Sequence, residues 1–389
     1  MKKYGVFMIL MAVLFTCASA IADDGNIDGV GDMLPDGRTA DPQMGRSLSP
    51  QIYRVDAGER YNPRLLHSAY YLSDNDIWFF VLKGKVGGYL IQTDIRANVL
   101  NMAEVPVVSG YDMEVLGIAK VNGQYLIGAR DSSTLRGVIT CLSDGKNKPR
   151  LYQLDSDIAV LKMIPSPDGM LVLGIKNEKN NPVLYLLMIN DRFDVVCSNA
   201  VFYGGPSADS AYLLNSSAMA ADDNIYIQVD CGVPDRLQPE HLFICFDRYG
   251  LEKWRIRLPD QLSIQSLSTA DDHVYLYGLT GDLNQNDVLV NHKATILCYS
   301  SDGKQEWQKI YESASMFYDG ASNGDGCVAI SGLDGDGTLH IYSTDSEGRT
   351  EKIAYIEMLN TNVRGLGITS DGVAVVLGHN DKELFVFTN

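Results

Sequence analysis

Positive charge, histidine and tryptophan are scarce in this 389-residue sequence. Lysine and arginine total 32 against 49 aspartate and glutamate residues, which gives a net charge of −17 at neutral pH. Because so acidic a chain repels phosphate groups, binding to nucleic acid or to anionic lipid surfaces is disfavoured. The six histidines show no H-x-x-x-H spacing and accompany no C-x-x-C pair, so no recognisable zinc motif is present.

Catalytic signatures are also absent. The sequence has no phosphate-binding P-loop, no glycine pattern leading from a strand into a helix, and no G-x-S-x-G nucleophile motif. Helical periodicity is nowhere sustained over ten residues after the N-terminal segment. These absences disfavour the common nucleotide-binding and hydrolase folds and favour an all-β fold.

Long apolar runs are missing except at the N-terminus. Residues 5–15 form an apolar run of eleven, preceded by Lys2 and Lys3 and followed by A-x-A cleavage signals at 18–20 and 20–22. Eleven residues are too few to span a bilayer, which takes about 20. We therefore predict a signal peptide at 1–22 and a secreted or periplasmic protein. A lipid anchor at Cys17 is disfavoured, because Thr16 is larger than the glycine or alanine usual before such a cysteine.

Residues 23–46 are rich in Asp, Gly and Pro and are predicted to form a flexible acidic leader. Asp24, Asn26 and Asp28 resemble the opening of a calcium-binding loop. The twelfth position is Pro35, where such a loop needs a bidentate acid, so a solvated linker is the alternative. Calcium is thus a possible ligand, and no other cofactor is predicted.

A tight turn followed by an apolar strand recurs every 46 to 55 residues in the rest of the chain. Such polar dipeptides between apolar runs are a strong hairpin signal, because they tolerate the positive φ of a tight turn. In five of the seven repeats a glycine is expected to end the strand that the turn opens. The turns are Asn75-Asp76, Asn122-Gly123, Asp168-Gly169, Asp223-Asn224, Asp272-His273, Asp325-Gly326 and Asp371-Gly372.

Each repeat contains further strands and a second tight turn, which makes four short strands per repeat. Four antiparallel strands at a period of 40 to 50 residues are typical of a β-propeller blade. Only 17 residues follow Gly372, too few for the last blade, while a spare strand at 52–55 precedes the first complete blade. The sequence thus predicts a single domain at 47–389, a seven-bladed β-propeller closed by its N-terminal strand.

Two repeats place a tryptophan four residues after the glycine of the second turn: 247–254 ends on Trp254, and 301–307 ends on Trp307. This pattern resembles quinoprotein-like (PQQ-like) propeller repeats, a WD40-like architecture in which the tryptophan docks onto the neighbouring blade. Pro149 is expected at the equivalent position of an earlier blade. The related enzymes bind their quinone through adjacent cysteines, and no two cysteines are adjacent here. The resemblance therefore implies the repeat without the cofactor.

Six cysteines follow the signal segment. An even number in an exported protein is compatible with disulfides. However, several fall on equivalent strands of different blades, and sheets about 10 Å apart are beyond bridging range. Buried free thiols are therefore predicted.

The longest connections, 231–240 and 280–293, are predicted on the same face of neighbouring blades. Function concentrates on loops that a rigid scaffold holds in place. The alternative is that these loops are tolerated surface insertions. The candidate ligand- or partner-binding residues are Arg236, Asp282, Asn284, Asn286, Asp287 and His292.

Three classes of function remain open. The first is a non-catalytic exported propeller that binds a protein, a glycan or an envelope component through its long-loop face. The second is a propeller enzyme that acts on glycans or uses a bound cofactor, and the third is an envelope assembly factor. A fold alone does not choose among them.

Overall fold

The computed structural model describes residues 51–55, 66–72, 77–83, 88–105, 113–143, 149–178, 181–202, 212–219, 224–231, 240–285, 288–333, 338–349, 352–357, 362–379 and 384–388. All lie in the compact unit Arg46–Asn389, distinct from the unit Met1–Gly45. The predicted signal segment, the leader and the calcium candidates Asp24, Asn26 and Asp28 fall outside these residues. No helix in the described part of the chain is long and apolar enough to cross a membrane.

The strands of the described residues form seven four-stranded sheets, and six of these use four consecutive strands each. The first three are formed by β2 (Leu66–Leu72), β3 (Ile77–Lys83), β4 (Gly88–Asp94) and β5 (Val99–Val105); by β6 (Met113–Val121), β7 (Gln124–Asp131), β8 (Gly137–Ser143) and β9 (Arg150–Gln153); and by β10 (Ile158–Ser166), β11 (Gly169–Glu178), β12 (Asn181–Asn190) and β13 (Val195–Phe202).

The next three follow the same pattern. They are formed by β14 (Tyr212–Met219), β15 (Ile225–Cys231), β16 (Glu240–Phe246) and β17 (Glu252–Arg257); by β18 (Leu262–Ala270), β19 (His273–Leu283), β20 (Leu289–Ser300) and β21 (Gln305–Tyr311); and by β22 (Phe317–Asn323), β23 (Gly326–Leu333), β24 (Thr338–Asp345) and β25 (Lys352–Glu357).

The remaining sheet joins the two ends of the described chain. β26 (Asn362–Ile368), β27 (Ala374–His379) and β28 (Leu384–Thr388) are completed by β1 (Gln51–Val55), which pairs antiparallel with β28 along all five residues. The spare strand at 52–55 therefore takes the place that the sequence predicts for it, as the outermost strand of the composite sheet.

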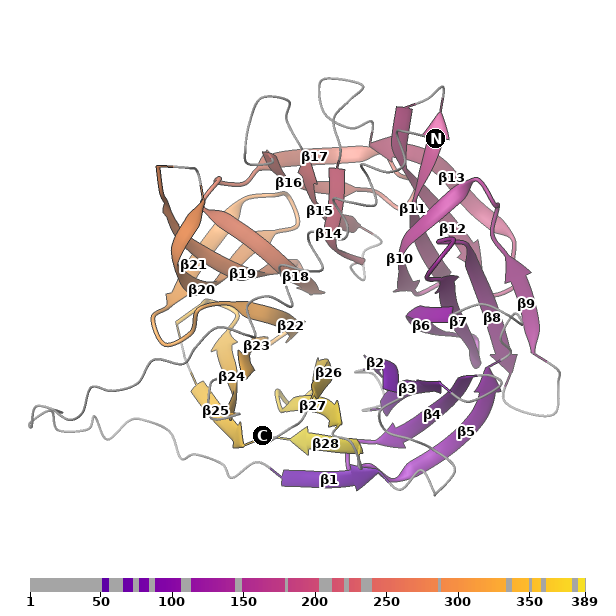
Figure 1. Ribbon diagram of the computed structural model, residues 1–389, viewed down its shortest axis with the longest axis horizontal. Helices are drawn as coiled ribbons and strands as arrows, with labels where there is room; N and C mark the ends of the chain where they lie inside the picture. Colours follow the sequence, from indigo (N-terminus) through magenta and orange to yellow (C-terminus); the bar gives the residue numbers. More distant parts are fainter. Residues whose placement is uncertain are drawn as a thin grey trace, which may run out of the picture. The chain divides into compact units, whose positions relative to one another are not determined.

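The sheets are arranged as propeller blades around a common axis (Figure 1). Each innermost strand contacts the innermost strand of the next sheet, and the contacts return to their start. The cyclic order is β2, β6, β10, β14, β18, β22 and β26. The all-β propeller with four-stranded antiparallel blades is therefore confirmed, and its ring closes between β26 and β2.

Some of the predicted tight turns have the positive φ that such dipeptides tolerate, whereas Asp168 and Gly169 do not. Asn122 and Gly123 both have positive φ, 50° and 73°, as a two-residue hairpin turn requires. One turn lies a residue earlier than predicted: Asp271 has positive φ, and His273 is already the first residue of β19.

Two tryptophans in outermost strands connect neighbouring blades by hydrogen bonds. The indole Nε1 of Trp254 in β17 donates to the carbonyl of Ser301 at 2.9 Å, and Trp307 in β21 donates to Ser346 at the same distance. Each ring lies against the turn glycine of the next blade, Gly303 or Gly348. The predicted blade-to-blade role of the tryptophans is confirmed.

The equivalent of the tryptophan in the β6–β9 sheet is Arg150 and not Pro149. Arg150 pairs with Cys141, as Trp254 pairs with Cys245. Its guanidinium donates to the carbonyl of Asp191 at 2.9 Å and lies 5.0 Å from the ring centroid of Phe193. A cation over an aromatic ring replaces the indole at this contact. The prediction missed by one residue, because a short polar turn does not fix the register of the strand that follows it.

The cysteines are free and buried, as predicted. Those that the structure describes are Cys141, Cys197, Cys231, Cys245, Cys298 and Cys327. They contribute to the apolar clusters between sheets, where a thiol acts as a small hydrophobic side chain.

Candidate ligand site at the channel mouth

Every innermost strand contains a β-bulge at the same place. The register with the second strand of the blade skips one residue near the start of each innermost strand, and such a bulge re-aims the side chains beside it. The skipped residues are His67, Leu116, Leu161, Asn215, Gln265, Tyr318 and Arg364.

Glycines of the second strand explain how several bulges fit. Gly174, Gly278 and Gly378 pair with the residue just before the bulge. A Cβ on Gly278 would lie 2.0 Å from the carbonyl oxygen of Ser263, so only glycine allows this backbone approach. Gly174 and Gly278 were predicted to end their strands, and for these two that prediction is wrong. β11 and β19 continue past them because the glycine accommodates a bulge in the partner strand.

The bulges lie toward the face that carries the connections between second and third strands. We call the seven bulge residues, with the residue that follows each, the channel mouth. Gln265 and Tyr318 are exposed there, Tyr318 to 54%, and Lys162, Ser266 and Asp319 are half-buried. Since these residues sit on innermost strands and still contact solvent, the ring axis is open to water at this end.

Asp319 in β22 is held by its neighbours. The hydroxyl of Ser266 in β18 donates to its Oδ1 at 2.8 Å, and the backbone N–H of Gly320 donates to the same oxygen at 2.9 Å. Burial raises the pKa of this carboxyl, and the two hydrogen bonds and the charge of Lys162 oppose the increase.

Lys162 in β10 follows the bulge at Leu161. Arg130 fixes this bulge, because its Nη1 donates to the carbonyls of Val160 and Leu161 at 3.0 and 3.1 Å. The Nε of Arg130 binds the Glu114 carboxylate at 2.8 Å. Burial lowers the pKa of the Lys162 amine; the charge of Asp319 acts against this decrease, and that of Arg130 adds to it.

Lys162 and Asp319 come from opposite sides of the ring. β10 and β22 are three positions apart in the cyclic order of seven innermost strands, so the electrostatic interaction between the two residues crosses the channel. With the Arg130–Glu114 pair, these described side chains bring equal numbers of positive and negative groups to one opening. The arrangement suits a polar ligand with many hydroxyls better than a strongly charged one.

The residues predicted from the loops lie apart from this cluster in sequence. Asp282 Oδ2 accepts from the side-chain amide of Asn291 at 3.0 Å, the side-chain Oδ1 of Asn284 accepts from the Val288 N–H at 3.0 Å, and His292 Nε2 lies 2.7 Å from the Leu289 carbonyl oxygen. These bonds are local to one hairpin. Arg236, Asn286 and Asp287 lie outside the described residues, so the binding role of the set stays a prediction.

The predicted loop at 280–293 is largely a strand extension. β19 continues to Leu283 and β20 begins at Leu289, so the hairpin projects beyond its blade with only a short connection. Alternating apolar and polar residues there were too few to indicate strands from sequence alone.

Sequence reasoning missed the bulge cluster. Two signals were available. The first is charge: Lys162 interrupts the apolar strand Ile158–Ser166, and Asp319 stands in a strand that must be innermost. A charged residue in such a strand is costly unless a channel or a partner accommodates it. The recurring glycine inside the second strand also indicates a bulge.

We expect the Lys162–Asp319 interaction to cost stability when only one partner is removed. Lys162→Met or Asp319→Asn alone leaves a desolvated charge without its opposite and is expected to lower the free energy of unfolding by about 1 to 3 kcal/mol. The double variant is expected to be close to wild type or above it. Denaturant unfolding of all four proteins gives the coupling energy. Strictly additive effects would show that the two charges do not interact across the channel.

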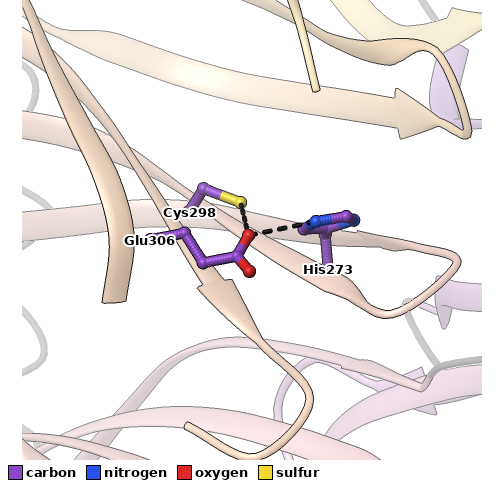
Figure 2. Close-up of side chains that lie close together, drawn as sticks. All are labelled: His273, Cys298 and Glu306. Atoms are coloured by element: carbon purple, nitrogen blue, oxygen red, sulfur yellow. Dashed lines mark hydrogen bonds and ion pairs between the residues drawn. The ribbon is translucent and has the colours of Figure 1, made fainter. Parts of the chain in front are cut away.

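A separate group of three side chains could hold a metal ion: His273, Cys298 and Glu306 (Figure 2). It lies on β19, β20 and β21, at the ends that face the tight turns and away from the channel mouth.

Comparison with known proteins identifies the fold. No family model and no curated protein matches the chain. Among solved structures, the polysaccharide lyase Uly1 matches with a TM-score of 0.53 at 11% identity, over 83% of this chain and 89% of that one. The β-propeller domain of the Trilobed protease from Pyrococcus furiosus matches with a TM-score of 0.52 at 9% identity, over 84% and 93%. At these identities the similarity shows a β-propeller fold and nothing finer, and the PQQ-like or WD40-like assignment is not confirmed.

Proposed function

We propose that this chain is an exported, non-catalytic binding protein that captures a glycan at the channel mouth. The observation that carries the proposal is the ring of bulges, which brings an exposed aromatic ring and a balanced set of polar groups to one opening. The N-terminal sequence supports export. No step of bond cleavage is required for this role.

Tyr318 supplies the apolar part of the proposed site. Its side chain is 54% exposed on an innermost strand, whereas the preceding Phe317 is fully buried against Tyr342 and Tyr311. Successive side chains of a strand point to opposite faces, and Tyr318, the residue that the register skips at the bulge, faces away from the core that holds Phe317. An exposed aromatic face with a hydroxyl at its tip suits the apolar face and hydroxyl rim of a sugar ring.

Polar groups next to Tyr318 would orient the bound glycan through hydrogen bonds. Asp319 follows it in β22, and Gln265 and Ser266 lie at the bulge of the adjacent β18. The Ser266–Asp319 hydrogen bond fixes the carboxylate, so its second oxygen is positioned before a ligand arrives. Preorganised acceptors and donors of this kind give specificity at low entropic cost.

Tyr318→Ala tests the proposal. On a glycan array, and by calorimetry with the best glycan, we expect the variant to lose at least about fivefold in affinity, since an aromatic contact is worth on the order of 1 kcal/mol or more. Tyr249→Ala is the matched control, because Tyr249 is exposed to 55% on an outer turn of another blade. Equal loss in both variants, or binding that neither variant changes, would contradict a site at the channel mouth.

An enzyme acting on glycans is the second candidate, and one observation favours it. Burial moves the pKa of Asp319 up and that of Lys162 down, both toward neutrality, at the same opening. General acid–base catalysis needs such groups. Release of shortened products from a bound glycan by the wild type, abolished in Asp319→Asn with binding retained, would replace the first proposal with this one.

A further inference from the structure

His273, Cys298 and Glu306 bring three different metal-ligating atoms together. Glu306 Oε2 lies 3.0 Å from His273 Nε2 and 3.7 Å from Cys298 Sγ, and all three ligand atoms lie within 4.8 Å of one another. Figure 2 shows the carboxylate between the thiol and the imidazole. Ligands of a tetrahedral Zn²⁺ at 2.0 to 2.3 Å are about 3.3 to 3.7 Å apart, so small side-chain movements give this geometry.

Strand register explains why the three side chains share one side of the sheet. Cys298 pairs with Tyr275, and His273 is two residues before Tyr275 on the same strand. Side chains two residues apart point to the same face of a sheet. Glu306 is the extra residue of a bulge in β21, because Cys298 pairs with Trp307 and Tyr299 with Gln305. A bulge turns its extra side chain out of the regular alternation, toward the face that Cys298 occupies.

The same local structure recurs in the preceding blade with different side chains. Cys245 pairs with Trp254 in β17, where Lys253 is the extra residue of the equivalent bulge, and Asn224 stands at the position of His273. There the Lys253 amine donates to the Asn224 side-chain oxygen at 2.7 Å. An ammonium group and an amide pair with each other at this position, and neither is a good metal ligand.

The β6–β9 sheet shows a third version. Cys141 has the equivalent position, and Gln124 begins β7 as His273 begins β19. The side-chain Oε1 of Gln124 accepts from the Cys141 thiol at 2.9 Å and from the Arg150 guanidinium at 3.1 Å. The cysteine is thus common to three blades, and an amide with a cation accompanies it in two of them. Of these three sheets, the β18–β21 sheet is the one that has an imidazole in place of the amide and a carboxylate in place of the cation.

We propose that His273, Cys298 and Glu306 form a binding site for Zn²⁺, with an imidazole nitrogen, a thiolate and a carboxylate oxygen as ligands and a fourth position open to water. The combination of ligand types suits zinc, which accepts nitrogen, sulfur and oxygen in a tetrahedral site. As the metal–sulfur bond forms, the thiol proton passes to solvent. His273 and Glu306 have side-chain exposures of 30% and 36%, so an ion can enter from solvent while the buried thiol closes the inner side.

Cobalt provides the direct test, because Co²⁺ takes the ligands of Zn²⁺ and a thiolate ligand gives a charge-transfer band in the near ultraviolet. We expect the full mature chain, without an affinity tag, to bind one equivalent of Co²⁺ with this band and to lose the band on addition of Zn²⁺. Saturating Zn²⁺ should also raise Tm by about 2 °C or more. Absence of the band in the folded wild type would overturn the proposal.

The preceding blade supplies matched variants that are expected to fold. His273→Asn with Glu306→Lys copies its arrangement and should abolish the band, as should Cys298→Ala. Cys245→Ala removes the equivalent cysteine of the control blade and should leave the band intact. A band that persists in the double variant would show that the thiolate belongs to another site and would overturn the assignment.

The reverse exchange places the residues of the proposed zinc site into the preceding blade. It tests whether the positions of His273 and Glu306 determine metal binding. Asn224→His with Lys253→Glu, made in the wild type, should create a second site beside Cys245 and double the bound Co²⁺. A folded variant that still binds one equivalent would contradict selection by these positions. A failure to find glycan binding at the channel mouth would contradict the proposed function and leave the zinc site unaffected. The zinc site lies on other strands than the channel mouth and at the opposite end of the blade.

Discussion

Deletion of residues 47–58 is expected to unfold or aggregate the protein. β1 pairs with β28 from the Gln51–Thr388 pair to the Val55–Leu384 pair, and Tyr53 packs against the cluster that joins the closing sheet to β4. The loss comprises ladder hydrogen bonds at about 1 kcal/mol each and the partial burial of Tyr53, which contributes only a fraction of the about 1.5 to 3 kcal/mol of a fully buried side chain. It also exposes β28 as an unprotected edge. Against a total stability of about 5 to 15 kcal/mol, this loss is decisive.

Thermal unfolding and size-exclusion chromatography of the deletion variant measure the effect. The control removes residues 23–46, a longer segment that lies, except for Arg46, outside the unit that holds the blades, and is expected to change Tm by no more than about 2 °C. A 47–58 deletion that melts like the parent would mean that the ring is stable without its closing strand.

Gly303→Ala is expected to destabilise the protein strongly. Gly303 has a φ of +84°, and an added Cβ would lie 2.9 Å from the Trp254 ring, so the indole must leave the blade contact. Positive φ costs about 1 to 2 kcal/mol for alanine, and overpacking adds about 1 to 3 kcal/mol. The expected loss in the free energy of unfolding is therefore about 2 to 5 kcal/mol, measured by denaturant titration.

Gly372→Ala separates the two contributions. Gly372 has a φ of +83°, almost that of Gly303, and no atom lies within 4 Å of the position that its Cβ would take. This control is expected to lose only the backbone contribution, about 1 to 2 kcal/mol. Equal losses at the two positions would show that the contact between Trp254 and the turn adds nothing to stability.

Sequence could predict the blades because their signals are local. An Asn-Gly or Asp-Gly turn between apolar runs specifies a hairpin within a few residues, as at Asn122 and Gly123. Closure by β1 was predictable from counting strands at the two ends. The position of Arg150 was not, since register across a turn depends on bulges and side-chain contacts that the sequence does not display.

The candidate sites were harder to predict because their residues are distant in sequence. Lys162 and Asp319 come from strands on opposite sides of the ring, and no spacing connects them. Cys298 and Glu306 are close in sequence, yet only the bulge in β21 puts them on one face. By contrast, Asp282, Asn284 and His292 were singled out because they lie in a long predicted loop. Loop length indicates exposure to solvent and says little about which side chains come together in one site.

The pairing of β1 with β28 also determines how the ring responds to force. Gln51 lies opposite Thr388, so the first residue of β1 and the last residue of β28 lie side by side at the same end of one antiparallel pair. Tension between these two strand ends loads the hydrogen bonds one after another, as in a zipper, instead of all at once in shear. A pull applied through both flanks would therefore peel β1 away at low force and open the ring at that seam, with the six blades of consecutive strands still folded. The same geometry makes this seam the natural place to join two propellers in tandem through a short linker.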